Sequence, residues 1–126
     1  MGTPAFAISP LQQILGSEHK VVAVITAPDR KSGRGKKLTP SPIKVFCEEN
    51  NLPVLQPTNL KDPALITQLR ELTPDVMVVV AFRMLPKEVW SIPPNGTFNL
   101  HASLLPKYRG AAPIHWSLIK GDEFTG

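Results

Sequence analysis

One cysteine, Cys47, is present in the 126 residues of this chain, and no apolar run approaches about 18 residues. A lone cysteine excludes an intramolecular disulfide and a zinc site built from several cysteines. Because a transmembrane helix needs about 20 mostly apolar residues in a row, a membrane span is also excluded. No secretory signal peptide is recognisable, and we therefore expect a cytoplasmic protein.

Charged residues make up only 19% of the chain, and hydrophobic residues make up 42%. That balance supplies enough apolar surface for a core and argues against an intrinsically disordered chain. The 14 prolines are scattered along the sequence, so they punctuate a fold and do not form a polyproline segment. The length fits one globular domain or part of one.

Positive charge is concentrated in one segment, residues 29–44. Six basic residues stand there against Asp29 alone, which gives the segment a net charge of +5, whereas the whole chain carries +4. A local excess of cations indicates a polyanionic partner or a phosphate-bearing ligand. The alternative is a solvated loop without a partner. The six basic residues are Arg30, Lys31, Arg34, Lys36, Lys37 and Lys44.

Hydrophobic periodicity predicts strands that alternate with helices. Expected helices cover residues 3–15, 41–47, 60–72, 86–90 and 113–120, and expected strands cover residues 21–25, 52–55, 75–81 and 97–101. Thr3 is expected to cap the first helix and Pro10 to kink it, and residues 26–42 are expected to form a loop. This alternation is typical of an α/β fold, here a Rossmann-like open, mainly parallel twisted sheet with helices on both faces.

Both ends of the sequence are expected to be cut. Only Met1 and Gly2 precede Thr3, too few for the strand that normally precedes such a helix in an α/β sheet. At the other end, residues 124–126 follow the last helix without a closing element.

Asn99 and His101 stand two residues apart at the end of an expected strand. Because side chains alternate along a strand, both would point to the same face, and open α/β sheets bind ligands at the carboxyl ends of their strands. An amide N–H beside an imidazole can stabilise a developing oxyanion and move a proton. Taken alone, such a pair is more often structural than catalytic.

The pair belongs to a longer pattern. Residues 99–114 read NLHASLLPKYRGAAPI, and this stretch closely resembles the signature of folate-dependent formyltransferases. Its GAAPI ending, residues 110–114, is most similar to that of the methionyl-tRNA formyltransferases. Three further segments resemble the same family in the right order: residues 1–7, 27–44 and 75–86. The resemblance therefore covers nearly the whole chain.

The resemblance implies a reaction and a catalytic pair. Family members transfer the formyl group of 10-formyltetrahydrofolate to the amino group of methionine on initiator tRNA, for translation initiation and without a metal. The Asn99 amide would donate to the formyl oxygen, and His101 would either help as a cation or relay a proton.

The family pattern also implies parts that this chain does not contain. It adds a catalytic aspartate, in a downstream Gly-x-Asp-Thr-Gly segment, and a C-terminal β-barrel domain that helps to hold tRNA. On that pattern Asp122 and Glu123 do not replace the missing aspartate. We therefore expect residues 1–126 to be part of an N-terminal catalytic domain, inactive alone, from an enzyme that is a monomer.

A folate pocket is implied in two segments. By resemblance its residues are Phe82, Arg83, Met84, Leu85, Ser103, Leu104, Leu105 and Pro106. The turn at residues 82–85 is one residue shorter than the commoner family form and looks like that of the related glycinamide ribonucleotide formyltransferases. For Met84, Leu104 and Leu105 the alternative is plain core packing.

The basic segment would then meet tRNA. In the family this loop lies against the acceptor end of the tRNA, which makes Arg30, Arg34, Lys36 and Lys37 candidate tRNA-binding residues that contact phosphates. Phosphate contacts set affinity and salt dependence rather than base choice. Arg30, like Lys31, can equally be a solvated residue.

Three alternatives stay open on the residues alone. One is another folate-dependent formyltransferase, acting on a small amine such as a sugar nucleotide or a purine precursor. Another is a non-catalytic tRNA-binding fragment that uses only the basic segment. The third is a nicotinamide-binding oxidoreductase, but Gly33-x-Gly35 lacks the third glycine of a dinucleotide fingerprint. No metal site is expected, because His115 has no cysteine or acidic partner at metal-ligand spacing.

Overall fold

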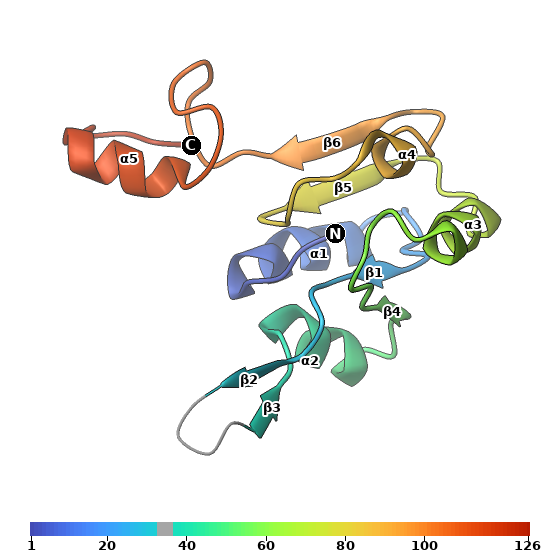
Figure 1. The fold of residues 1–126 in the computed structure, drawn as a ribbon. Coiled ribbons are helices and arrows are strands. Elements are labelled where there is room, and N and C mark those ends of the chain that lie inside the picture. Colours follow the sequence, from blue (N-terminus) through green and yellow to red (C-terminus); the bar gives the residue numbers. More distant parts are fainter. Residues whose placement is uncertain (33–36) are drawn as a thin grey trace.

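The computed structural model describes residues 1–32 and 37–126 (Figure 1). Its helices are the 3-10 helix η1 (Ala5–Ala7), α1 (Ile8–Leu15), α2 (Pro42–Glu49), α3 (Pro63–Glu71), α4 (Lys87–Trp90) and α5 (Pro113–Lys120). Its strands are β1 (Val24–Ile25), β2 (Arg30–Ser32), β3 (Lys37–Thr39), β4 (Val54–Leu55), β5 (Met77–Val80) and β6 (Thr97–Leu100). In the described residues, no helix is both long and apolar enough to cross a membrane.

The strands form mainly parallel pairs, which confirms the predicted α/β class. β1 pairs in parallel with β4, and β5 pairs in parallel with β6. Met1 and Gly2 join the two pairs: the Gly2 N–H donates to the Ile25 carbonyl at 3.0 Å, and the Val80 N–H donates to the Met1 carbonyl at 2.8 Å. A parallel bridge between Gly2 and Val80 therefore places the first two residues in the middle of the sheet (Figure 1).

Two apolar clusters lie on opposite faces of the sheet. Successive residues of a strand point to opposite faces, and accordingly Val24 belongs to one cluster and Ile25 to the other. α1 and α2 cover the first face with Leu11, Ile43 and Cys47, and α3 and α4 cover the second with Leu65, Leu69 and Val89. The prediction of helices on both faces is therefore confirmed.

Prolines and polar caps set where the helices begin. α2, α3 and α5 each start with a proline: Pro42, Pro63 and Pro113. A proline at that position costs no helical hydrogen bond, because its N–H would have no partner within the helix. At the start of α3 the Asp62 carboxylate accepts from the Ala64 N–H at 3.0 Å, a kind of cap worth about 1 kcal/mol. The expected Thr3 cap is wrong, since η1 follows Pro4 without any side-chain cap.

Pro10 lies in the first turn of α1, and the residue four before it, Phe6, belongs to η1. In a continuous α-helix the proline ring would clash with the carbonyl four residues earlier. The change from 3-10 to α geometry accommodates the proline, so the single helix expected over residues 3–15 is divided in two.

Several predicted segments differ from the structure. β4 and β5 are shorter than the strands expected over residues 52–55 and 75–81, and two further segments differ more. β1 covers only Val24–Ile25 and not residues 21–25, because its partner β4 starts after Pro53, which has no N–H to donate. Residues 26–42, expected to be a loop, contain the antiparallel hairpin of β2 and β3. The pairing of a hairpin is set by main-chain hydrogen bonds, which composition alone does not reveal.

Replacing Gly2 with alanine is expected to destabilise the protein. A Cβ at this position would lie 2.6 Å from the Ala7 Cβ and 3.1 Å from the Val80 carbonyl oxygen, so η1 would have to move away from the sheet. Overpacking of this kind typically costs about 1–3 kcal/mol, and thermal unfolding followed by circular dichroism should show a lower midpoint. Gly16→Ala is the matched control, because its nearest contact would be an ordinary 3.5 Å to the Gln12 carbonyl oxygen. An unchanged midpoint for Gly2→Ala would contradict the close approach.

Candidate active site

The carboxyl ends of the parallel strands meet at one edge of the sheet (Figure 1). In open α/β sheets this edge is where ligands bind. The chain leaves the edge at Thr26 after β1, at Gln56 after β4, at Ala81 after β5 and at His101 after β6. The candidate site is therefore built from four segments that lie far apart in the sequence.

Asn99 and His101 both lie at the carboxyl end of β6. Asn99 pairs with Val79 in the sheet register, and its side chain is exposed, with no hydrogen bond to the described part of the chain. The predicted strand is one residue too long, because β6 ends at Leu100 and His101 is the first residue beyond it. The Asn99 amide is therefore available to donate to a bound ligand.

One nitrogen of His101 is already engaged by the protein. Nε2 lies 3.0 Å from the Tyr108 carbonyl oxygen. Because a carbonyl only accepts hydrogen bonds, Nε2 must carry a proton and donate it. In the neutral ring, Nδ1 then holds the free electron pair and can accept a proton from a substrate. When the ring is protonated, Nδ1 becomes a second donor.

The loop after β6 is held by a contact between a tyrosine and an aspartate. The Tyr108 hydroxyl donates to Asp122 Oδ2 at 2.7 Å, and Lys107 Nζ lies 3.6 Å from Asp122 Oδ1. Tyr108 adopts a left-handed backbone conformation with φ of 52°, and its carbonyl is the group that meets His101. Asp122 thus holds the residue that orients His101. Sequence reasoning missed this contact, because no local pattern links two residues on opposite sides of α5.

Segment 103–106, the second half of the predicted folate site, is mostly exposed. Ser103 is buried, and its hydroxyl donates to the Lys107 carbonyl at 2.7 Å. Leu104 and Leu105 are 56% and 61% exposed, and Pro106 is exposed as well. These two leucines are therefore not core residues, and their apolar surface is open to a ligand.

The turn after β5, the first half of the predicted folate site, borders an open pocket of about 510 Å³. Residues 58–61 and 83–88 line this pocket. Met84 is 93% exposed, whereas Leu85 packs against the cluster beneath α3 and α4. Segment 103–106 does not line the pocket, so the structure does not bring the two predicted folate segments together in it.

Arg83 ties this turn to the segment after β4. Its guanidinium donates to the carbonyls of Pro57 and Thr58, and it lies 5.6 Å from the centre of the Phe82 ring. The forked guanidinium suits a pair of neighbouring carbonyls. Arg83 therefore shapes the pocket wall through contacts within the protein.

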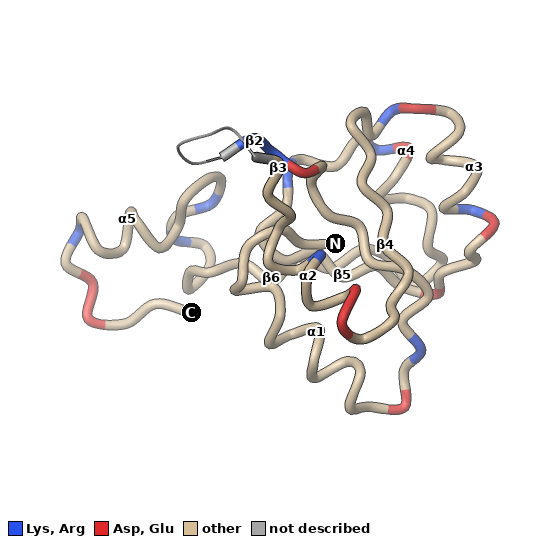
Figure 2. Tube along the Cα trace, turned by 90° about the horizontal axis from the view of Figure 1, so that it is seen from below, with Lys and Arg blue, Asp and Glu red and all other residues tan. Residues whose placement is uncertain are grey.

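Within the basic segment, residues 30–32 and 37–39 form the paired strands β2 and β3, which come after β1 in the chain, and Figure 2 shows basic residues in blue on β2. Arg30 is exposed there. Of Lys37 only the backbone pairing with Ser32 is described, and Arg34 and Lys36 lie outside the described residues. Arg30 is thus the one predicted tRNA-binding residue whose side chain is described. Within residues 1–32 and 37–126, no group of three or more His, Cys, Asp or Glu side chains is placed to hold a metal ion.

The family profile described as Formyl transferase matches residues 1–126. The chain belongs to the formyltransferase family. The family expected from the sequence is thereby confirmed, and a nicotinamide-binding oxidoreductase is set aside.

Curated relatives of this formyltransferase chain match it over its whole length. It is 57% identical over 126 residues to the methionyl-tRNA formyltransferase of Bacteroides thetaiotaomicron, 55% identical over 126 residues to that of Flavobacterium johnsoniae, and 53% identical over 127 residues to that of Geobacter metallireducens. Each match covers 100% of this chain but only 39%, 40% and 41% of the respective relative. The chain thus spans about two fifths of the length of these relatives.

Titration of Tyr108 tests the contact that holds the loop after β6. The hydrogen bond to Asp122 raises the pKa of Tyr108 above its ordinary value. The folded state therefore favours the neutral phenol. The interaction stabilises the protein fully at pH values below the ordinary tyrosine pKa, and this stabilisation is lost as the pH rises through the raised pKa of Tyr108. Tyr108 is the single tyrosine of the chain, and the difference in ultraviolet absorbance between the protein and Tyr108→Phe isolates its titration. We expect Asp122→Ala to lower the pKa of Tyr108 towards its ordinary value.

Glu123→Ala is the control for that titration, because Glu123 is a neighbouring exposed acid without a contact to Tyr108 in the described residues. It should leave the pKa of Tyr108 where it is. Equal pKa values in the unaltered protein and in Asp122→Ala would contradict the contact.

Proposed function

We propose that the protein containing this chain is a methionyl-tRNA formyltransferase. It transfers the formyl group of 10-formyltetrahydrofolate to the α-amino group of methionine on initiator tRNA, for translation initiation. The observation that carries this proposal is the identity of 50–57%, over the whole chain, to relatives that bear that name. As an enzyme of translation initiation, it would act in the cytoplasm, and we propose that it does so as a monomer.

On this proposal the chain supplies only part of the machinery. Residues 1–126 form part of the N-terminal catalytic domain, and the rest of the polypeptide supplies the aspartate segment and the C-terminal β-barrel domain. The residues of β6 and the loop after it then provide one portion of a catalytic set that is completed elsewhere.

The proposed chemistry is attack of an amine on a formyl carbonyl. A bond forms between the methionine nitrogen and the formyl carbon, and negative charge grows on the formyl oxygen. The exposed Asn99 amide donates to that oxygen, a contact that strengthens as the charge develops. The bond from the formyl carbon to N10 of the folate then breaks. His101 takes a proton from the attacking nitrogen at Nδ1, the nitrogen left free by the Tyr108 contact, and the proton ends on the departing nitrogen.

The donor would bind at the carboxyl edge of the sheet, between the turn at residues 82–85 and segment 103–106. Met84, Leu104 and Leu105 support this placement, because each exposes apolar surface that a flat aromatic ring system can cover. Arg83 would act by fixing the shape of the turn, since its guanidinium is engaged by the carbonyls of Pro57 and Thr58.

The tRNA would bind to the basic segment, residues 29–44, through Arg30, Arg34, Lys36 and Lys37. This proposal is supported by the net charge of the segment and by the exposure of Arg30 on β2. Contacts of this kind neutralise phosphates and release counterions, so the affinity should fall steeply with salt.

Formylation of charged initiator tRNA by the full-length protein, compared with that of small amines, tests the proposal. Preference for the charged tRNA supports it. Preference for a sugar-nucleotide or purine-precursor amine would assign the chain to another formyltransferase, and binding of tRNA without any formylation would indicate a non-catalytic tRNA-binding protein.

Asn99→Ala in the full-length protein is expected to lower kcat for formylation by about 10²–10³, because removal of one oxyanion donor typically has that effect. Steady-state kinetics with charged initiator tRNA measure it. Asn95→Ala is the matched control, since Asn95 is an exposed amide in the turn before β6, and it should retain the full rate. An intact rate in Asn99→Ala would remove Asn99 from the catalytic role.

Replacement of Arg34 and Lys36 by alanine is expected to raise the KM for charged tRNA and to leave kcat at saturation unchanged. Each phosphate interaction that the substitutions remove should make the slope of log affinity against log salt concentration shallower by about 1. Lys20→Ala is the control, because Lys20 is exposed on the segment before β1, at the opposite edge of the sheet. A salt dependence equal to that of the unaltered protein would exclude phosphate contacts by Arg34 and Lys36.

A further inference from the structure

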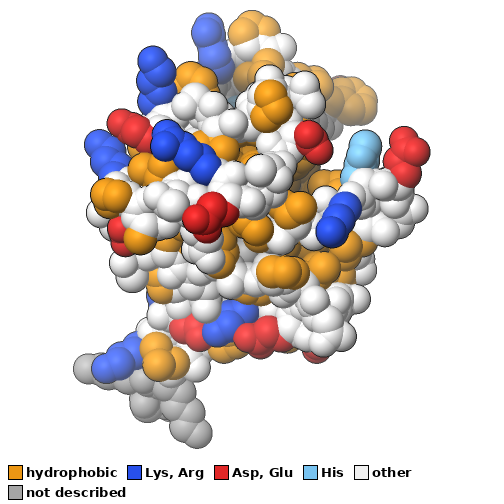
Figure 3. Space-filling model, turned by 90° about the vertical axis from the view of Figure 1, so that its right-hand side faces the viewer, with side chains coloured by type: hydrophobic (Ala, Val, Ile, Leu, Met, Phe, Trp, Pro, Cys, Tyr) orange, Lys and Arg blue, Asp and Glu red, His pale blue; other side chains and the backbone are white. Residues whose placement is uncertain are grey.

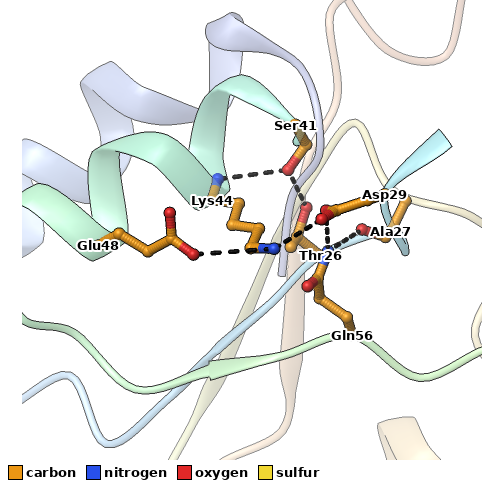
Figure 4. A network of polar contacts seen from close by, with 7 residues as sticks. All are labelled: Thr26, Ala27, Asp29, Ser41, Lys44, Glu48 and Gln56. Carbon is orange, nitrogen blue, oxygen red and sulfur yellow. Dashed lines mark hydrogen bonds and ion pairs between the residues drawn. The ribbon is translucent and has the colours of Figure 1, made fainter. Parts of the chain in front are cut away.

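Polar side chains from three segments meet at the base of the β2–β3 hairpin (Figure 4). Asp29 directly precedes β2, and its Oδ2 accepts from Lys44 Nζ at 2.7 Å while its Oδ1 accepts from Gln56 Nε2 at 2.7 Å. Lys44 belongs to α2, and Gln56 follows β4. We name Asp29, Lys44 and Gln56 the hairpin brace.

Further contacts fix both ends of the hairpin at this base. On the incoming side, Gln56 Nε2 also donates to the Ala27 carbonyl at 2.9 Å. On the outgoing side, Ser41 Oγ lies 2.8 Å from Thr26 Oγ1, and Thr26 is fully buried (Figure 4). Ser41 is also the cap of α2. The chain therefore enters and leaves the hairpin through anchored residues.

Beyond the base, the paired strands β2 and β3 lie past α2 in Figure 1. In Figure 3 the coloured side chains next to the grey segment lie at the lower edge of the molecule, and Leu38 on β3 is 66% exposed. A two-stranded hairpin without a packed face is marginally stable by itself. Its direction is therefore set at the base.

The hairpin brace can fix the direction of the hairpin, but it adds little to the free energy of unfolding of the domain. The Lys44 and Asp29 side chains are 19% and 26% exposed, and ion pairs that water can reach contribute little to the free energy of unfolding. The hydrogen bond from Lys44 lowers the pKa of Asp29 below its ordinary value. The carboxylate is therefore ionised at neutral pH, and the brace breaks only as the pH falls through that lowered pKa.

Within the basic segment, the brace pairs the charge of Lys44 with an acidic side chain. Lys44 is neutralised by Asp29 and lies 3.7 Å from Glu48 as well. The other five basic residues of the segment fall within residues 30–37 of the sequence, and two of them, Arg30 and Lys31, lie on β2. Asp29, the one acidic residue of this basic segment, is thus paired with Lys44 at the base of the hairpin.

We propose that Asp29 is a positioning residue for nucleic-acid binding. With Lys44 and Gln56 it fixes the direction in which the basic hairpin leaves the sheet, and it thereby sets the affinity for initiator tRNA without touching the reacting atoms. This inference rests on the proposed function, because it takes the hairpin to be a tRNA-binding element.

Simple electrostatics and positioning give opposite expectations for Asp29→Ala. Removal of an anion beside a cationic hairpin should strengthen tRNA binding if charge alone matters. Loss of the brace should weaken it. In the full-length enzyme we expect the KM for charged initiator tRNA to rise about tenfold, with kcat at saturating tRNA and the KM for 10-formyltetrahydrofolate unchanged.

Gln56→Leu breaks the brace without changing the charge, and it should raise the tRNA KM in the same direction. Because both substitutions remove the same hydrogen bond between Gln56 and Asp29, the double variant should show less than the product of the two effects. Glu49→Ala removes an exposed acid on α2 that has no contact to the brace in the described residues, and it should not raise the tRNA KM. Thermal midpoints are measured for every variant, and Gln56→Leu carries the test if Asp29→Ala does not fold.

An unchanged or lower tRNA KM in both Asp29→Ala and Gln56→Leu overturns the inference. If Arg34→Ala raises the tRNA KM in the same assays, the proposed function stands and only the role of the brace fails. If the unaltered enzyme does not formylate charged tRNA, the proposed function fails and the inference fails with it.

Discussion

The sheet is held together through the backbone of Met1 and Gly2. In the described residues the β1–β4 pair and the β5–β6 pair share no ladder, and they are joined by the hydrogen bonds that these two residues make to Ile25 and Val80. Gly2 can occupy this position because a side chain there would collide with Ala7. One pair carries the catalytic candidates and the other carries the basic hairpin, so the relative placement of the two halves of the site depends on this junction.

Sequence predicts the elements whose limits are fixed by local chemistry. α5 covers Pro113–Lys120 as predicted, because proline can start a helix and Gly121, with φ of 70°, can end one. The strand expected over residues 21–25 is shorter in the structure, because its length depends on where β4 begins, much later in the chain. The β2–β3 hairpin was not predicted, for a related reason. Glycines and charges are typical of a loop, and the composition of a segment does not show whether its strands pair.

The candidate site shows the same division. Strand alternation and a family resemblance direct attention to Asn99 and His101, and both lie at the carboxyl edge of the sheet. The contacts that hold their surroundings were not predictable, because Tyr108 meets Asp122, and Asp29 meets Gln56, only after the chain has folded. Candidate groups for ligand binding can thus be proposed from short motifs, whereas the contacts that hold their surroundings become visible only in the tertiary structure.

Cys47 gives the α1–α2 side of the core a chemical reporter. It is 0% exposed, and burial raises the pKa of its thiol. Thiol reagents react with the thiolate and need access to it, so the folded domain protects this sulfur in two ways. It is the one thiol of the chain, and it becomes reactive when α2 lifts from the sheet. The rate of its alkylation therefore reports the fraction of molecules in which this face of the domain is open.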